Sequence, residues 1–324
     1  MNSFFPSTEP MNINSRLSGN KWNEWSMIVM SEVVLPIDGG GTTTKFCLVE
    51  SENSLVIYES VIESGINLTA TTIRQQVQIL NEIKEQIRYF GEEAENVLTI
   101  VCAISGAGSN KRKKSFEKLL KTAFDVKDVI VLSDIEALRL LLFKDKPGIV
   151  VVCGTGSIAI SHSSSRVGGW GHLFGDEAGA FRIVVELIQR FYDHVDGVHP
   201  YDPVFESLKL FFNFTSPNEL TNLQARKDYK SKIASFASSM PLTDLTKTVI
   251  ETQINHFATK VSQLAKKESI NDIYLFGGMF KNEYFKDTFL RKLDTFNTQV
   301  VNKKLHVELA LNVKFLKKFL GISQ

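Results

Sequence analysis

The sequence predicts an α/β protein built from two lobes of similar plan. Segment 33–45 is an apolar run that ends in Asp-Gly-Gly-Gly-Thr-Thr-Thr-Lys, and segment 148–157 is a second apolar run that ends in Cys-Gly-Thr-Gly-Ser. A third strand-like run, 273–279, ends in a glycine pair before Met279. Repeated strand–glycine turn units indicate a duplicated architecture. With 324 residues, the chain also exceeds one typical hydrophobic core.

The first lobe is expected over residues 33–146. After the first glycine turn, segments 46–49 and 54–58 read as two further strands. Apolar residues then recur at helical spacing, at Ile73, Val77, Leu80, Ile83 and Ile87. The strand 97–104, a basic helix and the strand 129–132 complete the lobe. The order β-β-β-α-β-α-β is that of a ribonuclease-H-like lobe.

The second lobe is expected over residues 147–300, after a hinge at 144–148 that contains Pro and Gly. It repeats the strand meander from Ile149 and then inserts a helical stretch. That stretch carries apolar residues at helical spacing, at Ile250, Ile254, Phe257, Val261 and Leu264. A strand at 273–276 and a helix at 281–293 follow.

Both ends of the chain stand apart from this plan. Residues 1–32 are expected to be a disordered extension, and segment 1–29 lacks the apolar region of a signal peptide. Met27 and Met30 precede the first strand, so the alternative is that translation begins at one of them and that the residues before it do not belong to the protein. Residues 301–324 form a divergent C-terminal segment, in which Val313, Leu316 and Leu320 can line an amphipathic helix.

The charge and hydrophobicity of the sequence argue against nucleic acid and membranes as binding partners. The net charge of +1 argues against nucleic acid, because binding along a phosphate backbone requires a clear basic excess. The basic cluster Lys111–Lys114 leads into apolar residues at helical spacing and reads as a solvated helix face. No apolar stretch reaches the roughly 18 residues that a membrane helix needs. We therefore expect no membrane partner and a cytoplasmic location.

The three cysteines support the same location. Cys47, Cys102 and Cys153 lie in apolar, strand-like runs. An odd number without Cys-x-x-Cys spacing predicts neither a disulfide framework nor a metal site. We expect them to be reduced residues of the core.

The glycine turns are suited to phosphate. Glycine allows tight turns whose N–H groups approach a ligand closely, and successive exposed N–H groups form a concavity for anions. Asp38 adds a carboxylate, a usual ligand of Mg2+ beside phosphates. The first segment alone could also be a hairpin turn with a solubilising aspartate. Neither turn has the Gly-Lys-Ser/Thr of a Walker A loop or a dinucleotide fingerprint.

The order and spacing of the three glycine elements resemble the acetate kinase/sugar kinase/Hsp70/actin superfamily. The resemblance implies two ribonuclease-H-like, actin-like ATPase lobes that hold Mg-ATP in a cleft between them. It further implies that ATP phosphates contact two turns and that adenosine contacts the glycine pair. The residues concerned are Asp38, Gly39, Gly40, Gly41, Thr42, Thr43, Gly154, Thr155, Gly156, Ser157, Gly277 and Gly278. Lys45 is open to either a salt bridge or a phosphate contact.

The match narrows at segment 168–178, Gly-Gly-Trp-Gly-His-Leu-Phe-Gly-Asp-Glu-Ala. It resembles the G-W-G-x-x-x-G-D-E-G-S signature of the N-acetylglucosamine kinase family, within the BadF/BadG/BcrA/BcrD-type ATPase group. The sequence departs at its end, where Ala178-Gly179-Ala180 replaces the usual Gly-Ser. Small residues are kept, so we expect the backbone to be preserved, while the lost serine hydroxyl could alter contacts to the sugar.

The resemblance assigns the general base to Asp134, which follows the strand 129–132 and opens a helix. Phosphoryl transfer needs positioning, charge neutralisation and a base for the hydroxyl proton. Asp134 could instead cap the helix, a role that Ser133 can also fill. Glu136, three residues after Ser133, suits the helix start. Asp38 is the expected partner of Mg2+, through water.

The resemblance also supplies sugar-binding residues. Asn67 matches an asparagine that bonds ring hydroxyls, or it caps a helix over 68–90. Asp176 and Glu177 match the pair that reads sugar hydroxyls, with Asp176 expected to face the sugar; both could instead favour a helix dipole. Trp170 is either a wall for the sugar or a core residue, and His172 is expected to be structural. Ser105 and Gly106 are expected to line the acyl side of the sugar.

The resemblance implies an ATP-dependent kinase of a small-molecule amino sugar, with N-acetylglucosamine as the leading substrate and the 6-hydroxyl as the position that is phosphorylated. Glucosamine and N-acetylmuramic acid are the alternatives. A different class, the ATPase that activates radical dehydratases, would need paired cysteines at a dimer surface. A sugar sensor would need a helix-turn-helix and a zinc loop, neither of which is present in the sequence. An inactive homologue stays open because of the divergent C-terminal segment, and so does a homodimer.

Overall fold

The computed structural model describes residues 32–90, 97–143, 146–226 and 228–322. The expected extension 1–32 lies outside these ranges except for its last residue, and so do residues 144 and 145 of the expected hinge. Within the described ranges, no helix is long and apolar enough to cross a membrane.

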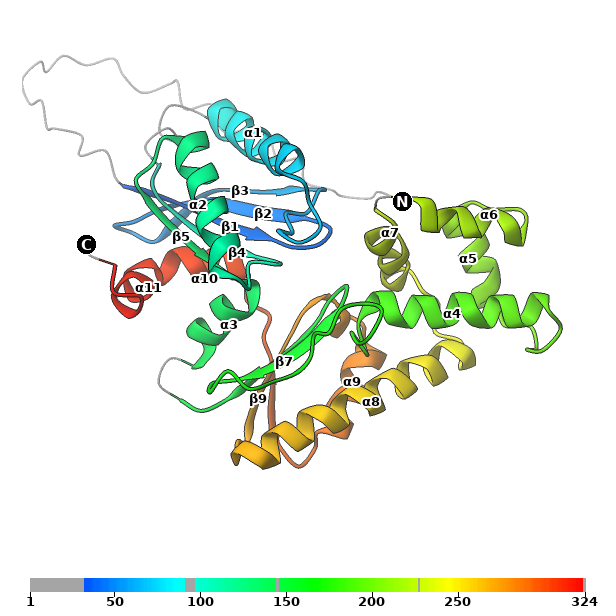
Figure 1. Cartoon of the computed structure of the whole chain (residues 1–324). Coiled ribbons are helices and arrows are strands. Elements are labelled where there is room, and N and C mark those ends of the chain that lie inside the picture. Colours follow the sequence, from blue (N-terminus) through cyan, green and yellow to red (C-terminus); the bar gives the residue numbers. More distant parts are fainter. Residues whose placement is uncertain (1–31, 91–96, 144–145, 227, 323–324) are drawn as a thin grey trace, which may run out of the picture. The chain divides into compact units, whose positions relative to one another are not determined.

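Two five-stranded sheets of the same strand order organise the fold (Figure 1). The first has the order β3-β2-β1-β4-β5 and the second β10-β9-β6-β7-β8, so each strand of one sheet has a counterpart in the other. The strands of the first sheet are β1 (Val33–Gly39), β2 (Thr44–Glu50), β3 (Leu55–Ile62), β4 (Val97–Ile104) and β5 (Asp128–Leu132). Those of the second are β6 (Ile149–Cys153), β7 (Ser157–Ser161), β8 (Arg166–Gly168), β9 (Asp272–Phe276) and β10 (Asn297–Val300).

The direction of the strands is also the same in both sheets. The first three strands of each sheet form an antiparallel meander, and β1–β4–β5 and β6–β9–β10 are parallel. Pro36 lies in the central strand β1, and the β1–β2 ladder has no paired residues at Leu35 and Pro36. A proline lacks the N–H that a ladder needs, which accounts for that gap. The predicted α/β class with two ribonuclease-H-like lobes is confirmed.

One face of the first sheet is covered by α1 (Ile73–Phe90) and α2 (Asn110–Phe124). The predicted buried face of α1 is partly wrong, because Ile73 is 68% exposed and Val77 is 36% exposed. The buried face runs instead through Gln76, Ile79, Leu80, Ile83 and Ile87. Gln76 occupies the first buried position because its amide donates to the Thr71 carbonyl oxygen at 3.0 Å.

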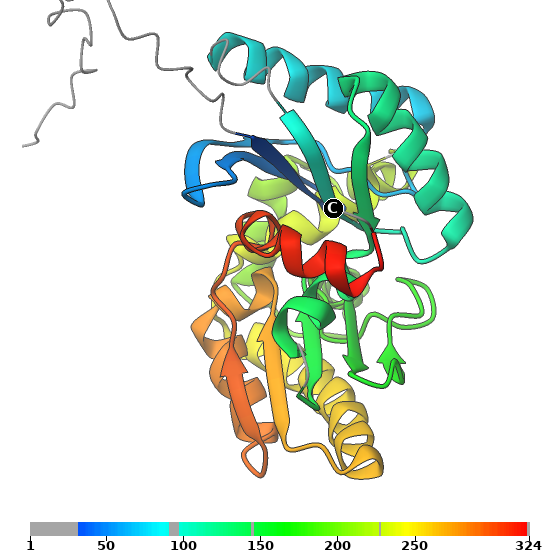
Figure 2. The same ribbon diagram turned by 90° about the vertical axis from the view of Figure 1, so that its left-hand side faces the viewer.

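The opposite face of the first sheet packs against α3 (Asp134–Phe143), α10 (Leu305–Leu311) and α11 (Val313–Phe319). Figure 2 shows the two C-terminal helices, in red, below the blue strands. Leu309 and Leu316 are fully buried there, whereas Leu320 is 39% exposed. The helices α10 and α11 of the segment that the sequence analysis described as divergent thus pack back on the first lobe.

The C-terminal segment is also held by ion pairs. Glu59 of β3 accepts from Lys304 at 2.6 Å and pairs with His306 at 2.8 Å. Burial lowers the pKa of His306, and the adjacent Glu59 opposes that effect. The hydrophobic cluster that contains Leu309 and Leu316 also includes Leu132 of β5 and Val150 of β6. It therefore connects the two lobes.

The helical insertion belongs to the second lobe and packs on one face of its sheet. Its helices are α4 (Ala180–Val195), α5 (Val204–Phe212), α6 (Pro217–Thr221), α7 (Tyr229–Ser235) and α8 (Asp244–Glu268). The predicted apolar positions of α8 are buried, from Ile250 to Leu264. The helix expected at 281–293 is α9 (Glu283–Lys292), and the strand β10 was missed because only four polar-rich residues form it.

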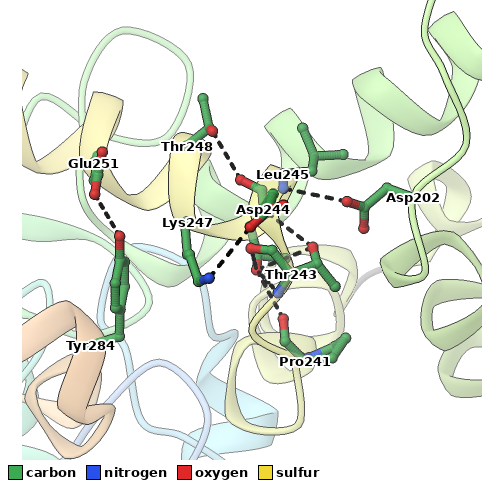
Figure 3. Close-up of polar contacts among 10 residues, drawn as sticks. Asp202, Pro241, Thr243, Asp244, Leu245, Lys247, Thr248, Glu251 and Tyr284 are labelled. Carbon is green, nitrogen blue, oxygen red and sulfur yellow. Dashed lines mark hydrogen bonds and ion pairs between the residues drawn. The ribbon is translucent and has the colours of Figure 1, made fainter.

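Figure 3 shows how α8 begins. Thr243 and Thr246 form a reciprocal capping box, in which the Thr246 N–H donates to Thr243 Oγ1 at 3.2 Å. Asp202 accepts from the Leu245 N–H at 3.3 Å and from the Val204 N–H at 2.9 Å, so one buried carboxylate joins the starts of α5 and α8. Within the insertion, the start of α5 is therefore fixed to the start of α8 at a defined point.

Candidate active site

The first group of predicted site residues lies at the carboxyl ends of three adjacent parallel strands. Asp38 is near the end of β1, Ser105 follows β4 and Asp134 follows β5. In open α/β sheets, ligands bind outside the carboxyl ends of the strands. Ser105 Oγ donates a hydrogen bond to Asp134 Oδ2 at 2.8 Å, so at least two of these side chains are in direct contact.

Ser105 also joins the glycine turn after β1 (residues 39–43), the first of two turns predicted to bind phosphate and named phosphate turns for that prediction, to the segment that contains Asn67. Its N–H donates to the Gly39 carbonyl oxygen at 2.8 Å, and its carbonyl oxygen accepts from the Leu68 N–H at 2.9 Å. Asn67 and Ser105 form an isolated parallel bridge. Ser105 thus contacts Gly39, Asn67 and Asp134 and brings these three residues together.

Asn67 does not cap α1, which begins at residue 73 and not at 68. Thr72 and Gln75 cap that helix, because the Thr72 N–H donates to Gln75 Oε1 at 2.9 Å. Asn67 Oδ1 accepts instead from the Thr69 N–H at 2.9 Å, within its own turn. Gly106, with a φ of +78°, packs on this amide: a Cβ there would lie 2.6 Å from Asn67 Oδ1.

Ser133 and Glu136 cap the start of α3, so Asp134 is not needed as the N-cap residue of this helix. Glu136 Oε2 accepts from the Ser133 N–H at 2.9 Å, and the Glu136 N–H donates to Ser133 Oγ at 3.2 Å. This is a capping box. Asp134 Oδ1 accepts from the Ile135 N–H at 2.9 Å, and its Oδ2 is held by Ser105.

The ionisation of Asp38 is altered by its surroundings. Burial raises its pKa to about 6, Lys45 acts in the opposite direction, and the like charge of Asp134 raises it further. Lys45 is the cross-strand partner of Asp38 in the β1–β2 register. A cation beside Asp38 would relieve both the burial and the repulsion. One carboxylate suits Mg2+, which keeps most of its water and binds phosphate oxygens as well.

That fit needs no further protein ligands. Within the described ranges, no group of three or more His, Cys, Asp and Glu side chains is arranged to hold a metal ion. A Mg2+ ion at Asp38 would have to be held mainly by water and phosphate oxygens.

Gly65, to which the sequence analysis gave no role, packs against the first phosphate turn. The Gly40 N–H donates to the Thr43 carbonyl oxygen at 3.0 Å. Gly65 lies directly against this turn, since a Cβ on it would be 2.4 Å from the Gly40 carbonyl oxygen and 2.5 Å from the Gly41 carbonyl carbon. A glycine at this position, two residues before Asn67, is the feature of the sequence that could have indicated this contact.

We expect Gly65→Ala to weaken nucleotide binding at least tenfold while the protein stays folded. The added methyl group has no room beside Gly40, so the turn must move away from its anion-binding geometry. Titration with Mg-ATP followed by calorimetry measures the change, with thermal unfolding as a check of the fold. Glu63→Ala, at an exposed side chain on the same segment, is the matched control. Unchanged affinity in Gly65→Ala would contradict the expectation.

The second group of predicted residues lies on the second sheet, at the carboxyl ends of the parallel strands β6 and β9. In the turn after β6, the Gly154 N–H donates to the Gly156 carbonyl oxygen at 2.9 Å. The Ala180 and Phe181 N–H groups donate to the carbonyl oxygens of Gly154 and Thr155 at 2.8 and 3.0 Å. The first turn of α4 therefore holds the second phosphate turn in place.

Asp176 and Glu177 point in different directions. A Cβ on Gly156 would be 2.5 Å from Asp176 Oδ2, so the Asp176 carboxylate packs directly on the second phosphate turn. Glu177 is bound to Lys260 of α8 at 2.5 Å, and its carbonyl oxygen accepts from Ser157 Oγ at 2.5 Å. Burial raises the pKa of Glu177, but Lys260 outweighs it and the net pKa is lowered.

Two lysines that the sequence analysis did not single out accompany these carboxylates. Lys260 is the partner of Glu177, and Lys230 of α7 lies 3.4 Å from Asp176 Oδ2. Both come from the helical insertion, far along the chain from segment 168–178. Only the three-dimensional fold reveals them, because no local sequence pattern marks either lysine.

The departure from the family signature has a structural consequence. Ala178 has a φ of +63°, a left-handed conformation that costs a non-glycine residue about 1–2 kcal/mol. Gly179 is tightly enclosed, since a Cβ there would be 2.7 Å from the Gly156 Cα. A serine at position 179 would collide with the second phosphate turn in this backbone. In this backbone Ala178 is therefore under strain and Gly179 is required.

Trp170 is 60% exposed, so it is not a core residue. The Arg166 guanidinium lies over its ring at 4.2 Å. His172 Nε2 is hydrogen-bonded to the Tyr229 hydroxyl at 2.7 Å and packs on Phe181, as expected of a structural residue. Burial and Lys230 lower the pKa of His172.

The glycine pair after β9 lies beside β6. Gly277 has a φ of +119°, and a Cβ on it would be 2.3 Å from the Cys153 carbonyl oxygen. Gly278 has open space around its Cα and begins a short 3₁₀ turn, Gly278–Lys281. The bare backbone at Gly278 is compatible with a flat ligand.

A comparison with family models decides the family. The model described as the BadF/BadG/BcrA/BcrD ATPase family matches residues 35–310, which is most of the chain. The chain belongs to this family. The match includes the two glycine turns after β1 and β6, the signature segment and all but the last residue of α10.

Curated relatives of this BadF/BadG/BcrA/BcrD family member include two kinases. A Clostridium acetobutylicum protein, named N-acetylmuramic acid/N-acetylglucosamine kinase, is 28% identical over 161 residues, which is 48% of this chain and 52% of that protein. A Dictyostelium discoideum protein, named N-acetyl-D-glucosamine kinase, is 26% identical over 208 residues, 58% of this chain and 63% of that protein. The chain thus spans about half to two thirds of the length of these relatives.

A solved structure supports the fold of this family member. A proposed N-acetylglucosamine kinase from Porphyromonas gingivalis superposes with a TM-score of 0.69 at 16% identity. The superposition covers 86% of this chain and 97% of that protein. At this identity the likeness concerns the fold, and it confirms the actin-like ATPase architecture.

Proposed function

We propose that this protein is an ATP-dependent kinase that transfers phosphate to the 6-hydroxyl of an amino sugar. N-acetylglucosamine is the leading candidate for that sugar. The main support is the contact between Ser105 and Asp134 at 2.8 Å, beside Asp38 and Asn67, at the carboxyl ends of the parallel strands. This arrangement offers a base, a hydrogen-bonding asparagine and a cation-binding carboxylate. The family membership and the two kinase relatives agree with it.

Each residue has a role in this proposal. Asp134 accepts the proton of the sugar 6-hydroxyl, because a carboxylate suffices when that proton leaves late in a loose transition state. Asp38 holds the cation through water, and the backbone N–H groups of the two glycine turns bind phosphates. Asn67 and Asp176 bind ring hydroxyls. Bound Mg-ATP would supply the phosphoryl group.

The buried cysteines disfavour the activating-ATPase alternative. Cys47, Cys102 and Cys153 are all free and fully buried. Burial raises the pKa of Cys47 to about 12, so its thiol is protonated at neutral pH. A bridging iron–sulfur cluster needs thiolates that are presented at a surface, which none of these three provides.

A coupled assay of ADP release tests the proposal. The protein is assayed with Mg-ATP and, in turn, N-acetylglucosamine, glucosamine, N-acetylmuramic acid, glucose and no sugar. We expect ADP release that depends on an N-acetylated hexosamine, with the 6-phosphate as product by mass spectrometry and NMR. ADP release that is independent of sugar would indicate an ATPase, and no release with intact ATP binding would indicate an inactive homologue.

A further inference from the structure

Glu136 does more than cap α3. Lys113 of α2 lies 2.7 Å from Glu136 Oε1 and 2.6 Å from Oε2, so its ammonium group contacts both oxygens of one carboxylate. Oε2 also accepts from the N–H and the hydroxyl of Ser133 at 2.9 and 3.1 Å. Four contacts therefore meet on one side chain, which lies next to Asp134 in the first turn of α3.

The ion pair is protected more than most surface pairs. The Lys113 side chain is only 19% exposed and that of Glu136 is 36% exposed. Burial raises the pKa of Glu136, but the bonds from Lys113 and Ser133 outweigh it, and the net pKa is lowered. Glu136 is thus an ionised residue throughout the neutral range, and its contact with Lys113 is a charged hydrogen bond, the stronger kind.

The pair links the two segments that define the position of Asp134. The segment from β4 to α2 carries Ser105, which binds Asp134 Oδ2 at 2.8 Å, and eight residues later it carries Lys113. The start of α3 carries Ser133, Asp134 and Glu136 within one turn. Two separate bonds, Ser105 to Asp134 and Lys113 to Glu136, therefore connect the same two segments.

We propose that Lys113 and Glu136 are positioning residues that set the orientation of Asp134, acting through the first turn of α3. This inference rests on the proposed function, in which Asp134 is the base. The backbone of Asp134 lies between Ser133 and Glu136, so a shift of the capping box moves its Cα directly. A displacement of about 1 Å in a reacting group can reduce the rate about a hundredfold. Lys113 adds the charge that fixes the capping box against α2.

Substitutions separate the ion pair from the cap. Glu136→Gln keeps an oxygen that can accept from the Ser133 N–H, but it loses the charge that Lys113 binds. Lys113→Met loses the same pair from the other side, and Lys113→Arg restores a cation. We expect kcat for sugar phosphorylation to fall about 10- to 100-fold in Glu136→Gln and Lys113→Met, with KM values within about threefold of the original, and to recover partly in Lys113→Arg.

The matched control is Glu117→Gln, which removes the exposed pair between Glu117 and Lys121 at 2.7 Å on the same helix. We expect its kcat to be unchanged. A purely structural role of Glu136 would lower the melting temperature and leave kcat unchanged, and that result would overturn the proposal.

A double-substitution experiment identifies the route of the effect. In an Asp134→Asn background, Glu136→Gln should lower the residual rate by less than about twofold, because the residue that it positions no longer acts as a base. A full additional 10- to 100-fold loss would mean that Glu136 acts elsewhere and would overturn the proposal. If the unmodified protein phosphorylates no amino sugar, the proposed function itself fails, an outcome that is separate from all of these.

Discussion

Replacing Asp134 by Asn is expected to lower kcat for sugar phosphorylation by about 10²- to 10⁴-fold, the usual contribution of a general base. The amide cannot take up the hydroxyl proton. Its oxygen can still accept from the Ile135 N–H and its NH2 group can donate to Ser105 Oγ, so the local structure should persist. Affinities for sugar and Mg-ATP should stay within a few fold. Single-turnover kinetics together with calorimetric binding separate these quantities.

Asp125→Asn is the control for this substitution. Asp125 is exposed and ends α2 in a left-handed conformation, with a φ of 54°, which asparagine tolerates as well as aspartate does. We expect full activity in that variant. If Asp134→Asn retained more than about a tenth of kcat, the base would have to be another residue, and the assignment of Asp134 would be wrong.

Replacing Asp38 by Asn is expected to make the metal-free protein more stable and the enzyme inactive. The folded protein holds the Asp38 carboxyl with a pKa of about 6, against an ordinary value of 3.8, mainly because of burial. Ionising it in the folded state is therefore unfavourable by at most about 3 kcal/mol. Asparagine has a similar shape without the charge, so this destabilisation should disappear. Activity should be lost because the cation loses its carboxylate partner.

The pH dependence has a definite sign. Below about pH 4 the Asp38 carboxyl is protonated in both the folded and the unfolded protein, so the unmodified protein and the Asp38→Asn variant should be equally stable. Between about pH 4 and pH 6 the unfolded protein has released this proton while the folded protein still holds it, so the unmodified protein loses stability relative to the variant, and the loss is complete above about pH 6. Above pH 7 the variant should melt roughly 5 °C higher in a chelating buffer.

Differential scanning fluorimetry across pH 4–8, with chelator and then with Mg-ATP, measures both effects. Mg-ATP should raise the melting temperature of the unmodified protein more than that of Asp38→Asn, because ligand that binds only the folded state stabilises it. A variant that melts lower than the original protein at pH 8 would show that Asp38 has stabilising partners that outweigh its burial.

Most of the fold could be predicted from the sequence because its signals are local. Glycine turns after Val- and Ile-rich runs marked both β-meanders, and helical spacing marked α2 and α8. The start of α1 was placed too early because Asn67 resembled a cap, whereas the pair Thr72 and Gln75 forms the actual one. Strand β10 has almost no apolar residues and is specified by its pairing with β9, which a sequence pattern does not reveal.

The candidate site was predictable in its residue types and only partly in its contacts. Asp38, Ser105 and Asp134 could be named because each follows a recognisable strand. Contacts between distant segments could not be foreseen: Gly65 against the first phosphate turn, Lys230 beside Asp176 and Lys113 on Glu136. Such contacts depend on how elements pack, and packing is determined by the whole chain. The roles of these residues in catalysis stay predictions until the assays are done.

The position of α10 affects how the protein can be made in the cell. Strands β1, β2, β4 and β5 are complete once residue 132 has been synthesised, but the helix that packs on the inner face of that sheet begins at Leu305, about 170 residues later. At ribosomal rates of about 5–20 residues per second, that delay is roughly 10–35 seconds. During this time the apolar side chains under α10, such as Cys47 and Val49, lack their final cover. We therefore expect the nascent first lobe to keep part of this apolar face exposed until α10 and α11 have been synthesised.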